Sequence, residues 1–193
     1  IKGPPGTTVD LRVEPAAGGP ARELTVERAD VRQPAVDGTI RKVDGKKIAY
    51  VVFRTFSEGA HGELRAEIER LYRRGAEGLV LDLRGNGGGL LNEAVLSASI
   101  FVEDGVIVTT KGRTQPDHTY EAEGDALPPR PIVVLINGDT ASASEIFTAA
   151  LSDAGLAKVA GETSFGKGVF QEVIELDGAI FFGTADRLGA EAQ

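Results

Sequence analysis

A lysine set among glycines, in the segment GETSFGKG at residues 161–168, is the first group in this sequence that could do chemistry. Two glycines separated by four residues precede Lys167, as in a phosphate-binding P-loop, where a Ser or Thr then binds magnesium. Here Gly168 takes that place, and the following VFQEVIEL alternates like a strand instead of opening a phosphate-binding helix. The segment therefore argues against nucleotide binding. Taken alone, it favours a hairpin turn with a solvated lysine.

A serine occupies a second position suited to chemistry. The segment NGDTASASEI, residues 137–146, follows the most apolar run of the chain and opens a helical pattern. A serine at such a strand-to-helix junction can expose its hydroxyl, while nearby N–H groups and the helix dipole stabilise a developing oxyanion. Ser142 and Glu145 also fit the S-x-x-E capping box, in which serine only caps the helix. Both interpretations stay open from this segment alone.

Short apolar runs alternating with helical patterns predict the α/β core that must position these groups. We expect helices at residues 63–74, 91–100 and 141–154, because apolar residues recur there at helical spacing. Short apolar or alternating runs predict strands at residues 48–53, 78–82, 106–110, 131–136, 158–160, 170–176 and 179–182. The pattern is that of a central sheet covered by helices.

The N-terminal part has a different pattern. Two alternating strands, near residues 8–13 and 23–27, are joined by a Gly-Gly-Pro turn and predict a hairpin with too little apolar mass to be stable alone. Residues 30–47 are polar and rich in turn residues, which predicts a linker. The expected organisation is therefore a hairpin unit at 1–29, a linker at 30–47 and a main domain at 48–193.

Composition excludes several classes of function. A net charge of -8 and a pI near 4.9 argue against a nucleic-acid footprint. The absence of cysteine excludes disulfides, zinc thiolate sites and a cysteine nucleophile. No apolar run is long enough to span a bilayer and no signal peptide is present, although the first residue is not methionine. These features predict a soluble, globular protein.

Five segments in order resemble the C-terminal processing peptidases, also called tail-specific proteases, which are serine proteases with a Ser-Lys active site. The segments are IKGPPGTTVDLRV, IAYVVFRTFSE, DLRGNGGGLL, NGDTASASEI and GETSFGKGVFQ. The resemblance implies the spiral α/β core of this family, related to the ClpP/crotonase architecture, with the N-terminal hairpin as a remnant of a PDZ domain. The hairpin would then be the C-terminal part of that PDZ domain.

The resemblance implies a role for five residues. Ser142 would be the nucleophile, Lys167 the general base and Gln171 the residue that orients the lysine, while the backbone N–H groups of Gly88 and Ala143 would form the oxyanion hole. A neutral amine can replace histidine as the base in Ser-Lys sites. In a straight strand Gln171 would lie about 13 Å from Lys167, so a bend near Gly168 is required.

The same resemblance implies protein or peptide substrates with accessible carboxyl-terminal tails, no cofactor, no metal and no nucleic acid. It also implies an extracytoplasmic location, and it is compatible with a homo-oligomer. The family usually has proline where this chain has Gly87, and its PDZ module is longer. We therefore expect a fragment with low activity of its own. Two alternatives are a non-catalytic scaffold or peptide-binding module of the same fold, and an acyl-CoA-type enzyme with a glycine-loop oxyanion hole.

Overall fold

The structure is a computed structural model that describes residues 3–29, 34–111, 116–176, 179–185 and 188–189, with side chains described through residue 169. The chain divides into two compact units, Ile1–Gln33 and Pro34–Gln193. The first unit holds strands β1 (Thr8–Val13) and β2 (Arg22–Glu27), which pair antiparallel. Val9 lies opposite Val26 and Leu11 opposite Leu24, so the alternating residues predicted for this hairpin meet across its two strands.

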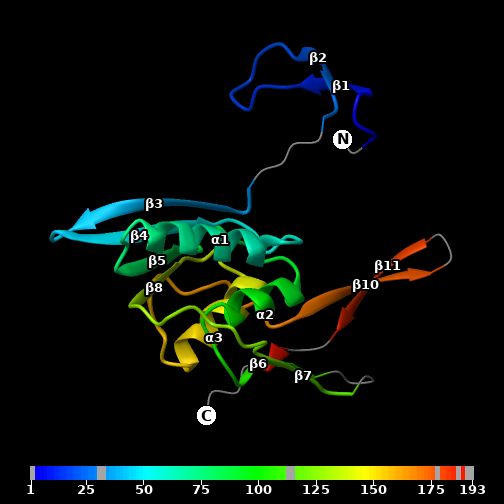
Figure 1. The fold of residues 1–193 in the computed structure, drawn as a ribbon. Coiled ribbons are helices and arrows are strands. Elements are labelled where there is room, and N and C mark those ends of the chain that lie inside the picture. The colour runs from blue at the N-terminus through cyan, green and yellow to red at the C-terminus, as the bar shows by residue number, and fades with distance from the viewer. Residues whose placement is uncertain (1–2, 30–33, 112–115, 177–178, 186–187, 190–193) are drawn as a thin grey trace. The chain divides into compact units, whose positions relative to one another are not determined.

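The second unit is built on a five-stranded sheet in the order β3-β4-β5-β8-β9 (Figure 1). Strand β3 (Val36–Val43) is antiparallel to β4, whereas β4 (Lys46–Phe53), β5 (Gly78–Asp82), β8 (Ile132–Ile136) and β9 (Ala157–Gly161) run parallel to one another. Helices α1 (Ala60–Arg73) and α3 (Ala143–Asp153) pack against strands of this sheet, and α2 (Leu91–Ser99) packs against both helices. The result is the mixed α/β architecture expected from the sequence.

Two smaller β-elements complete the described part of this unit. Strands β6 (Val106–Thr110), β7 (His118–Glu121) and β12 (Leu188–Gly189) form a sheet in the order β12-β6-β7. Strands β10 (Phe170–Leu176) and β11 (Ala179–Ala185) form an antiparallel hairpin. Strand β7 was not expected. Its sequence HTYE is short and polar and has no apolar alternation that would indicate a strand. The strand forms through its antiparallel pairing with β6.

The expected linker at residues 30–47 is corrected by the structure within its described part. Residues 36–43 form β3, which pairs with β4 along its whole length. Asp44 and Gly45 both have positive φ, 50° and 80°, as a two-residue hairpin turn with the right twist requires. The polar residues that suggested a linker are the exposed side of this edge strand, since Val36 is buried and Ile40 half-buried.

The core beneath the sheet holds a cluster of aromatic side chains. Phe53 at the end of β4, Phe56 in the next loop and Phe147 on α3 are fully buried, with ring centroids 4.3 to 6.1 Å apart. Aromatic pairs at such separations add stability beyond the area that they bury. Because Phe147 lies one turn into α3, this cluster fixes the start of that helix against β4.

Three loops follow the carboxyl ends of adjacent parallel strands. Residues 83–90 (the glycine loop) follow β5, residues 137–142 (the serine turn) follow β8, and residues 162–168 (the lysine loop) follow β9. Carboxyl ends of parallel strands lie at one edge of a sheet, which is where open α/β sheets bind ligands. Within the described residues, no helix is long and apolar enough to cross a membrane.

Candidate active site

Ser142 lies immediately before α3 with a backbone conformation that an ordinary helix cap does not have. Its φ is 58° and its ψ is -120°, whereas a residue that only caps a helix is extended. A non-glycine residue in such a sparsely populated region costs about 1–3 kcal/mol and is found mainly at functional sites. The same sharp strand-to-helix turn presents the nucleophile in serine hydrolases with a nucleophile elbow. The geometry therefore favours a nucleophile over a simple cap.

Glu145, one turn into α3, links the serine turn to the lysine loop. Its carboxylate Oε2 accepts the backbone N–H of Ser142 at 2.7 Å and that of Lys167 at 2.9 Å. Its Oε1 accepts the Ser164 hydroxyl and the Gly166 N–H, both at 2.7 Å. Two loops from different strands are thus fastened to one side chain. The predicted capping box of Ser142 and Glu145 is present, and the first link is one half of it. The other three links are tertiary contacts that the sequence pattern did not reveal.

The charge of Glu145 is stabilised by these donors. Burial alone would raise the pKa of its carboxyl group. The hydrogen bonds from Ser164, Gly166, Ser142 and Lys167 outweigh that effect and hold the pKa below its usual value. Glu145 is therefore an ionised acceptor in the folded chain, and charge-assisted bonds of this kind are stronger than bonds between neutral groups.

The lysine loop bends sharply at Lys167. The Gly168 N–H donates to the Gly166 carbonyl at 3.1 Å, which makes a three-residue turn centred on the lysine. The loop is also held at Phe165, whose N–H donates to the Thr140 carbonyl in the serine turn at 2.9 Å. The bend that the sequence required near Gly168 is therefore present. The backbone of Gln171 lies on β10, and its side chain lies outside the described residues.

Gly88 packs directly against the serine turn. A Cβ atom built on Gly88 would lie 2.7 Å from the Ala141 carbonyl oxygen and 2.9 Å from the Ala143 nitrogen, and the φ of Gly88 is 98°. Only glycine fits such a close approach at positive φ. The two N–H groups predicted for the oxyanion hole thus come from neighbouring pieces of backbone. In this structure, however, the Gly88 N–H donates to the Asn86 side-chain oxygen at 2.9 Å.

Asn86 is the buried residue that joins the glycine loop to the serine turn. Its side-chain nitrogen donates to the Phe53 carbonyl at 2.8 Å, and its backbone carbonyl accepts the Ala141 N–H at 3.1 Å and the Ser144 hydroxyl at 3.0 Å. Its amide orientation is fixed because one side faces an acceptor and the other a donor. Sequence reasoning missed this residue, although an Asn between an apolar strand and a run of glycines is a signal for a hydrogen-bonded turn.

Asp82 and Arg84 flank the start of the glycine loop. Asp82 accepts bonds from the Arg84 side chain, at 2.9 and 2.7 Å, from the Arg84 N–H at 3.1 Å and from the Tyr50 hydroxyl. The Arg84 side chain and then the Tyr50 hydroxyl, against the opposing effect of burial, lower the pKa of Asp82 to about 2. The two residues therefore anchor the start of the glycine loop.

Comparison with known proteins identifies the class to which this fold and site belong. The model of peptidase family S41 matches residues 47–188, so the chain belongs to this family of serine peptidases. The resemblance seen in the sequence is confirmed. The structure also matches that of the photosystem II D1 C-terminal processing protease, with a TM-score of 0.73 and 32% identity, over 97% of this chain and 52% of that one.

Two relatives illustrate the relationship at the level of sequence. A carboxyl-terminal-processing protease of Picosynechococcus is 38% identical over 180 residues, which are 93% of this chain and 44% of that protein. A tail-specific protease of Haemophilus influenzae is 38% identical over 175 residues, which are 89% of this chain and 25% of that protein. The chain therefore spans less than half the length of each of these relatives.

Proposed function

We propose that this chain forms the catalytic core of a serine endopeptidase that cleaves protein substrates near their carboxyl terminus. The single observation that carries the proposal is the Glu145 carboxylate, which holds the backbone of Ser142 in a strained turn and the backbone of Lys167 beside it. A helix cap needs neither the strain nor the link to the lysine loop. Membership of the S41 family and the names of the relatives support the same activity.

In the proposed mechanism the amine of Lys167, in its neutral form, takes the proton of the Ser142 hydroxyl as the serine oxygen attacks the scissile carbonyl carbon. The carbonyl oxygen becomes an oxyanion that the N–H groups of Gly88 and Ala143 stabilise. The C–N bond then breaks, and Lys167 returns the proton to the leaving amine. Water, deprotonated by Lys167, hydrolyses the acyl-enzyme and restores the serine. Gln171 would orient the lysine, and neither a cofactor nor a metal is required.

The bond between the Gly88 N–H and Asn86 has a consequence for this mechanism. An N–H group that is donated to Asn86 is not free to stabilise an oxyanion, so the Gly88 peptide has to turn when substrate binds. Gly87 is suited to such a rotation because glycine tolerates a wide range of backbone angles. The space around it is also open, since a Cβ atom built there would meet nothing within 4 Å. The proposed oxyanion hole is thus completed by the substrate.

A second candidate, a non-catalytic scaffold or peptide-binding module of the same fold, is favoured by that same occupied N–H. A protein without catalysis has no need to free it. Retention of both Ser142 and Lys167 at the junction of the loops argues for the enzyme. The third candidate, an acyl-CoA-type enzyme, would use the glycine loop but has no use for the serine turn and lysine loop together.

The finer features implied by the resemblance belong to the same proposal. We assign the second unit to the spiral core related to the ClpP/crotonase architecture, and the β1–β2 hairpin to the end of a PDZ domain. We also propose that the substrates are proteins or peptides with accessible tails and that the protein is extracytoplasmic. A homo-oligomeric state would be compatible with the family. The names of the relatives, which describe carboxyl-terminal processing, support the substrate class.

Labelling with a serine-directed fluorophosphonate tests the proposal. We expect covalent label on the wild-type protein, loss of label in Ser142→Ala and retention in Ser152→Ala, which changes an exposed serine at the far end of α3. Lys167→Arg should also prevent labelling, because a guanidinium does not deprotonate to serve as a base. Equal labelling of wild type and Ser142→Ala would show that Ser142 is not the nucleophile and leave it as a helix cap.

A further inference from the structure

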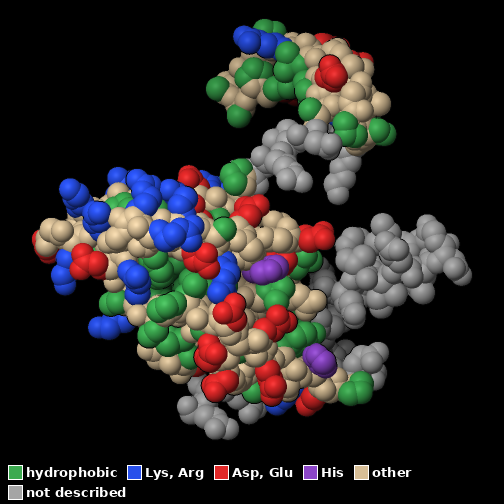
Figure 2. Space-filling view, in the orientation of Figure 1, with side chains coloured by type: hydrophobic (Ala, Val, Ile, Leu, Met, Phe, Trp, Pro, Cys, Tyr) green, Lys and Arg blue, Asp and Glu red, His purple; other side chains and the backbone are tan. Residues whose placement is uncertain are grey.

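Figure 2 shows the Lys and Arg side chains of the second unit gathered over the region of β3, β4 and α1, with some acidic side chains among them. At the opposite end of this unit, around β6 and β7, acidic side chains predominate. Exposed acids at that end are Glu103, Asp104, Glu121 and Glu123. The whole chain carries a net charge of -8, so the charge of the basic region is opposite in sign to that of the chain.

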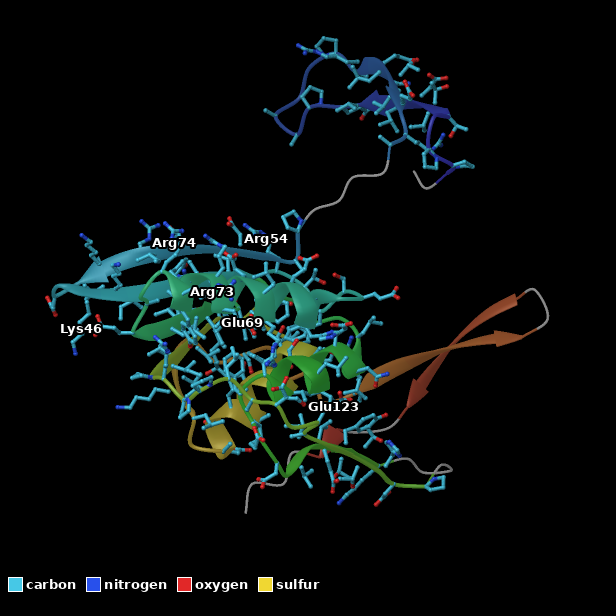
Figure 3. The ribbon with its side chains drawn as sticks, in the orientation of Figure 1. Lys46, Arg54, Glu69, Arg73, Arg74 and Glu123 are labelled. Carbon is cyan, nitrogen blue, oxygen red and sulfur yellow. The ribbon has the colours of Figure 1, made fainter. Side chains whose placement is uncertain are left out.

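The turn end of the β3–β4 hairpin is the most basic part of this region. Four exposed cations flank one exposed acid, Asp44, within a stretch of seven residues; the cations are Arg41, Lys42, Lys46 and Lys47. Figure 3 shows Lys46 at the turn end of the hairpin, and Arg73 and Arg74 nearby at the end of α1. The hairpin and the end of α1 thus form one basic surface, which we call the basic tip.

Elsewhere on this face, Arg54 pairs with Asp37 at 3.6 Å and Arg70 pairs with Glu67. Within the basic tip, Arg73 pairs with Glu69 at 3.4 Å. Among the residues that the structure describes, Lys42 and Lys46 have no acidic partner within ion-pair distance. Lys47 donates to the Arg74 carbonyl at 3.0 Å, which leaves its charge uncompensated too. The excess positive charge is therefore concentrated at the basic tip.

Protection of a sheet edge does not account for this concentration. β3 is an edge strand, and charged side chains on edge strands prevent unwanted pairing with other strands. Lysine is common at such edges, but Lys46 and Lys47 lie on β4, which is an inner strand of the sheet. The basic tip also carries Val43, whose 54% exposure leaves an apolar side chain in solvent between the lysines. A group of positive side chains around an exposed apolar residue is suited to binding an anionic partner.

We propose that the basic tip docks on an anionic phospholipid surface. Clusters of four to eight Lys or Arg bind anionic lipid headgroups, and each cation near the surface contributes separately to the attraction. Lysine suits mobile headgroups because it is a flexible point charge, while a folded acidic protein would call for the fixed fork of arginine or a groove. Val43 would enter the headgroup region. The acidic end around β6 and β7 would be repelled, which would orient the second unit with the basic tip toward the lipid.

Co-sedimentation with vesicles tests this assignment. We expect the protein to bind vesicles of phosphatidylcholine mixed with phosphatidylglycerol, not to bind phosphatidylcholine alone, and to be released by salt, which screens exposed charges. The double variant Lys42→Gln/Lys46→Gln should weaken binding about thirtyfold, and Lys42→Glu/Lys46→Glu should weaken it further. Both lysines are exposed, so unchanged melting temperatures should accompany these losses.

The matched control is Lys111→Glu/Lys158→Glu, which makes the same change in net charge as Lys42→Glu/Lys46→Glu, at exposed residues of the second unit after β6 and on β9, outside the basic tip. It should bind mixed vesicles nearly as well as the wild type does. Three results would each overturn the proposal: no binding to mixed vesicles at low salt, equal loss in the control and the Lys42/Lys46 variants, or preferential binding to polyglutamate over mixed vesicles. The last result would identify an acidic polypeptide as the partner.

Discussion

The backbone N–H groups of Ser142 and Lys167 donate to the same oxygen, Oε2 of Glu145, at 2.7 and 2.9 Å. The two nitrogens are therefore no further apart than the sum of these distances, although the residues belong to different loops. Both bonds end on an ionised acceptor, so this carboxylate helps to set the position of the proposed base relative to the proposed nucleophile. A second link between the two loops is the bond from the Phe165 N–H to the Thr140 carbonyl.

Replacing Glu145 with Gln should therefore impair both stability and labelling. All four partners of the carboxylate are donors, and the amide NH₂ group of Gln would face some of them without an acceptor. We expect a loss of about 1–3 kcal/mol in the free energy of unfolding and slower fluorophosphonate labelling at a temperature where the protein stays folded. Denaturant titration and labelling rates measure the two effects.

The control for this variant is Glu162→Gln, which changes an exposed carboxylate in the same loop. It should leave stability and labelling nearly unchanged. If Glu145→Gln labels as fast as the wild type, the link between the two loops is not needed for reactivity.

The backbone strain at Ser142 makes a prediction that is independent of activity. At a φ of 58° and ψ of -120° a residue without Cβ is favoured, so Ser142→Gly should be more stable than the wild type by about 1 kcal/mol. If Ser142 were an ordinary cap, Ser142→Gly would instead be less stable than the wild type by a few tenths of a kcal/mol. Thermal melts of the variant and the wild type decide between the two possibilities, and a less stable variant would argue that the serine turn is not strained.

The sequence was sufficient for the elements with strong local patterns. The expected strands at residues 78–82, 106–110 and 170–176 have the bounds that the structure gives them. Strand β3 was mistaken for a linker because most of its exposed residues are polar or charged and Gly38 interrupts its apolar face. The Asp44-Gly45 turn was the signal for a hairpin, but the flanking residues did not alternate clearly enough to be recognised as strands.

The site was foreseeable where motifs are local and unforeseen where contacts are distant. Ser142, Gly88 and Lys167 stand in short motifs with recognisable turn residues. The bond from Lys167 to Glu145 spans 22 residues and the bond from Ser144 to Asn86 spans 58. Such contacts depend on the order of β5, β8 and β9 in the sheet, which periodicity does not specify. The sequence thus indicated which residues could react but not what holds them together.

Asp82 should make the protein less stable in acid. Its folded pKa of about 2 lies below the ordinary value of 3.8, so its contribution to stability is present above pH 4 and is lost as the pH falls from about 4 to about 2. The full contribution is about 2 kcal/mol, less the share that solvent screens at the half-exposed Arg84. Denaturant titrations across this pH range measure the loss.

In Asp82→Asn the decline over that pH range should be smaller than in the wild type, because the titrating group is gone. Asp104→Asn changes an exposed carboxylate instead, and its free energy of unfolding should decline as that of the wild type does. A wild-type curve that stays flat between pH 4 and pH 2 would show that the Asp82–Arg84 pair contributes no net stability.

The last prediction separates the two adjacent glycines of the proposed oxyanion loop. In Gly88→Ala the new Cβ would lie 2.7 Å from the Ala141 carbonyl oxygen, at a φ of 98°, so either the loop or the serine turn must move. We expect a loss of about 1–3 kcal/mol in the free energy of unfolding from the backbone conformation alone, together with loss of fluorophosphonate labelling.

Gly87→Ala is the matched control for stability, because a Cβ there meets nothing within 4 Å. Its free energy of unfolding should be unchanged or higher by up to about 1 kcal/mol. If Gly87→Ala also slows labelling while it stabilises the fold, the rotation of the Gly88 peptide away from Asn86 limits the reaction. Labelling of Gly88→Ala at the rate of the wild type would show instead that the close contact between Gly88 and the serine turn has no part in reactivity.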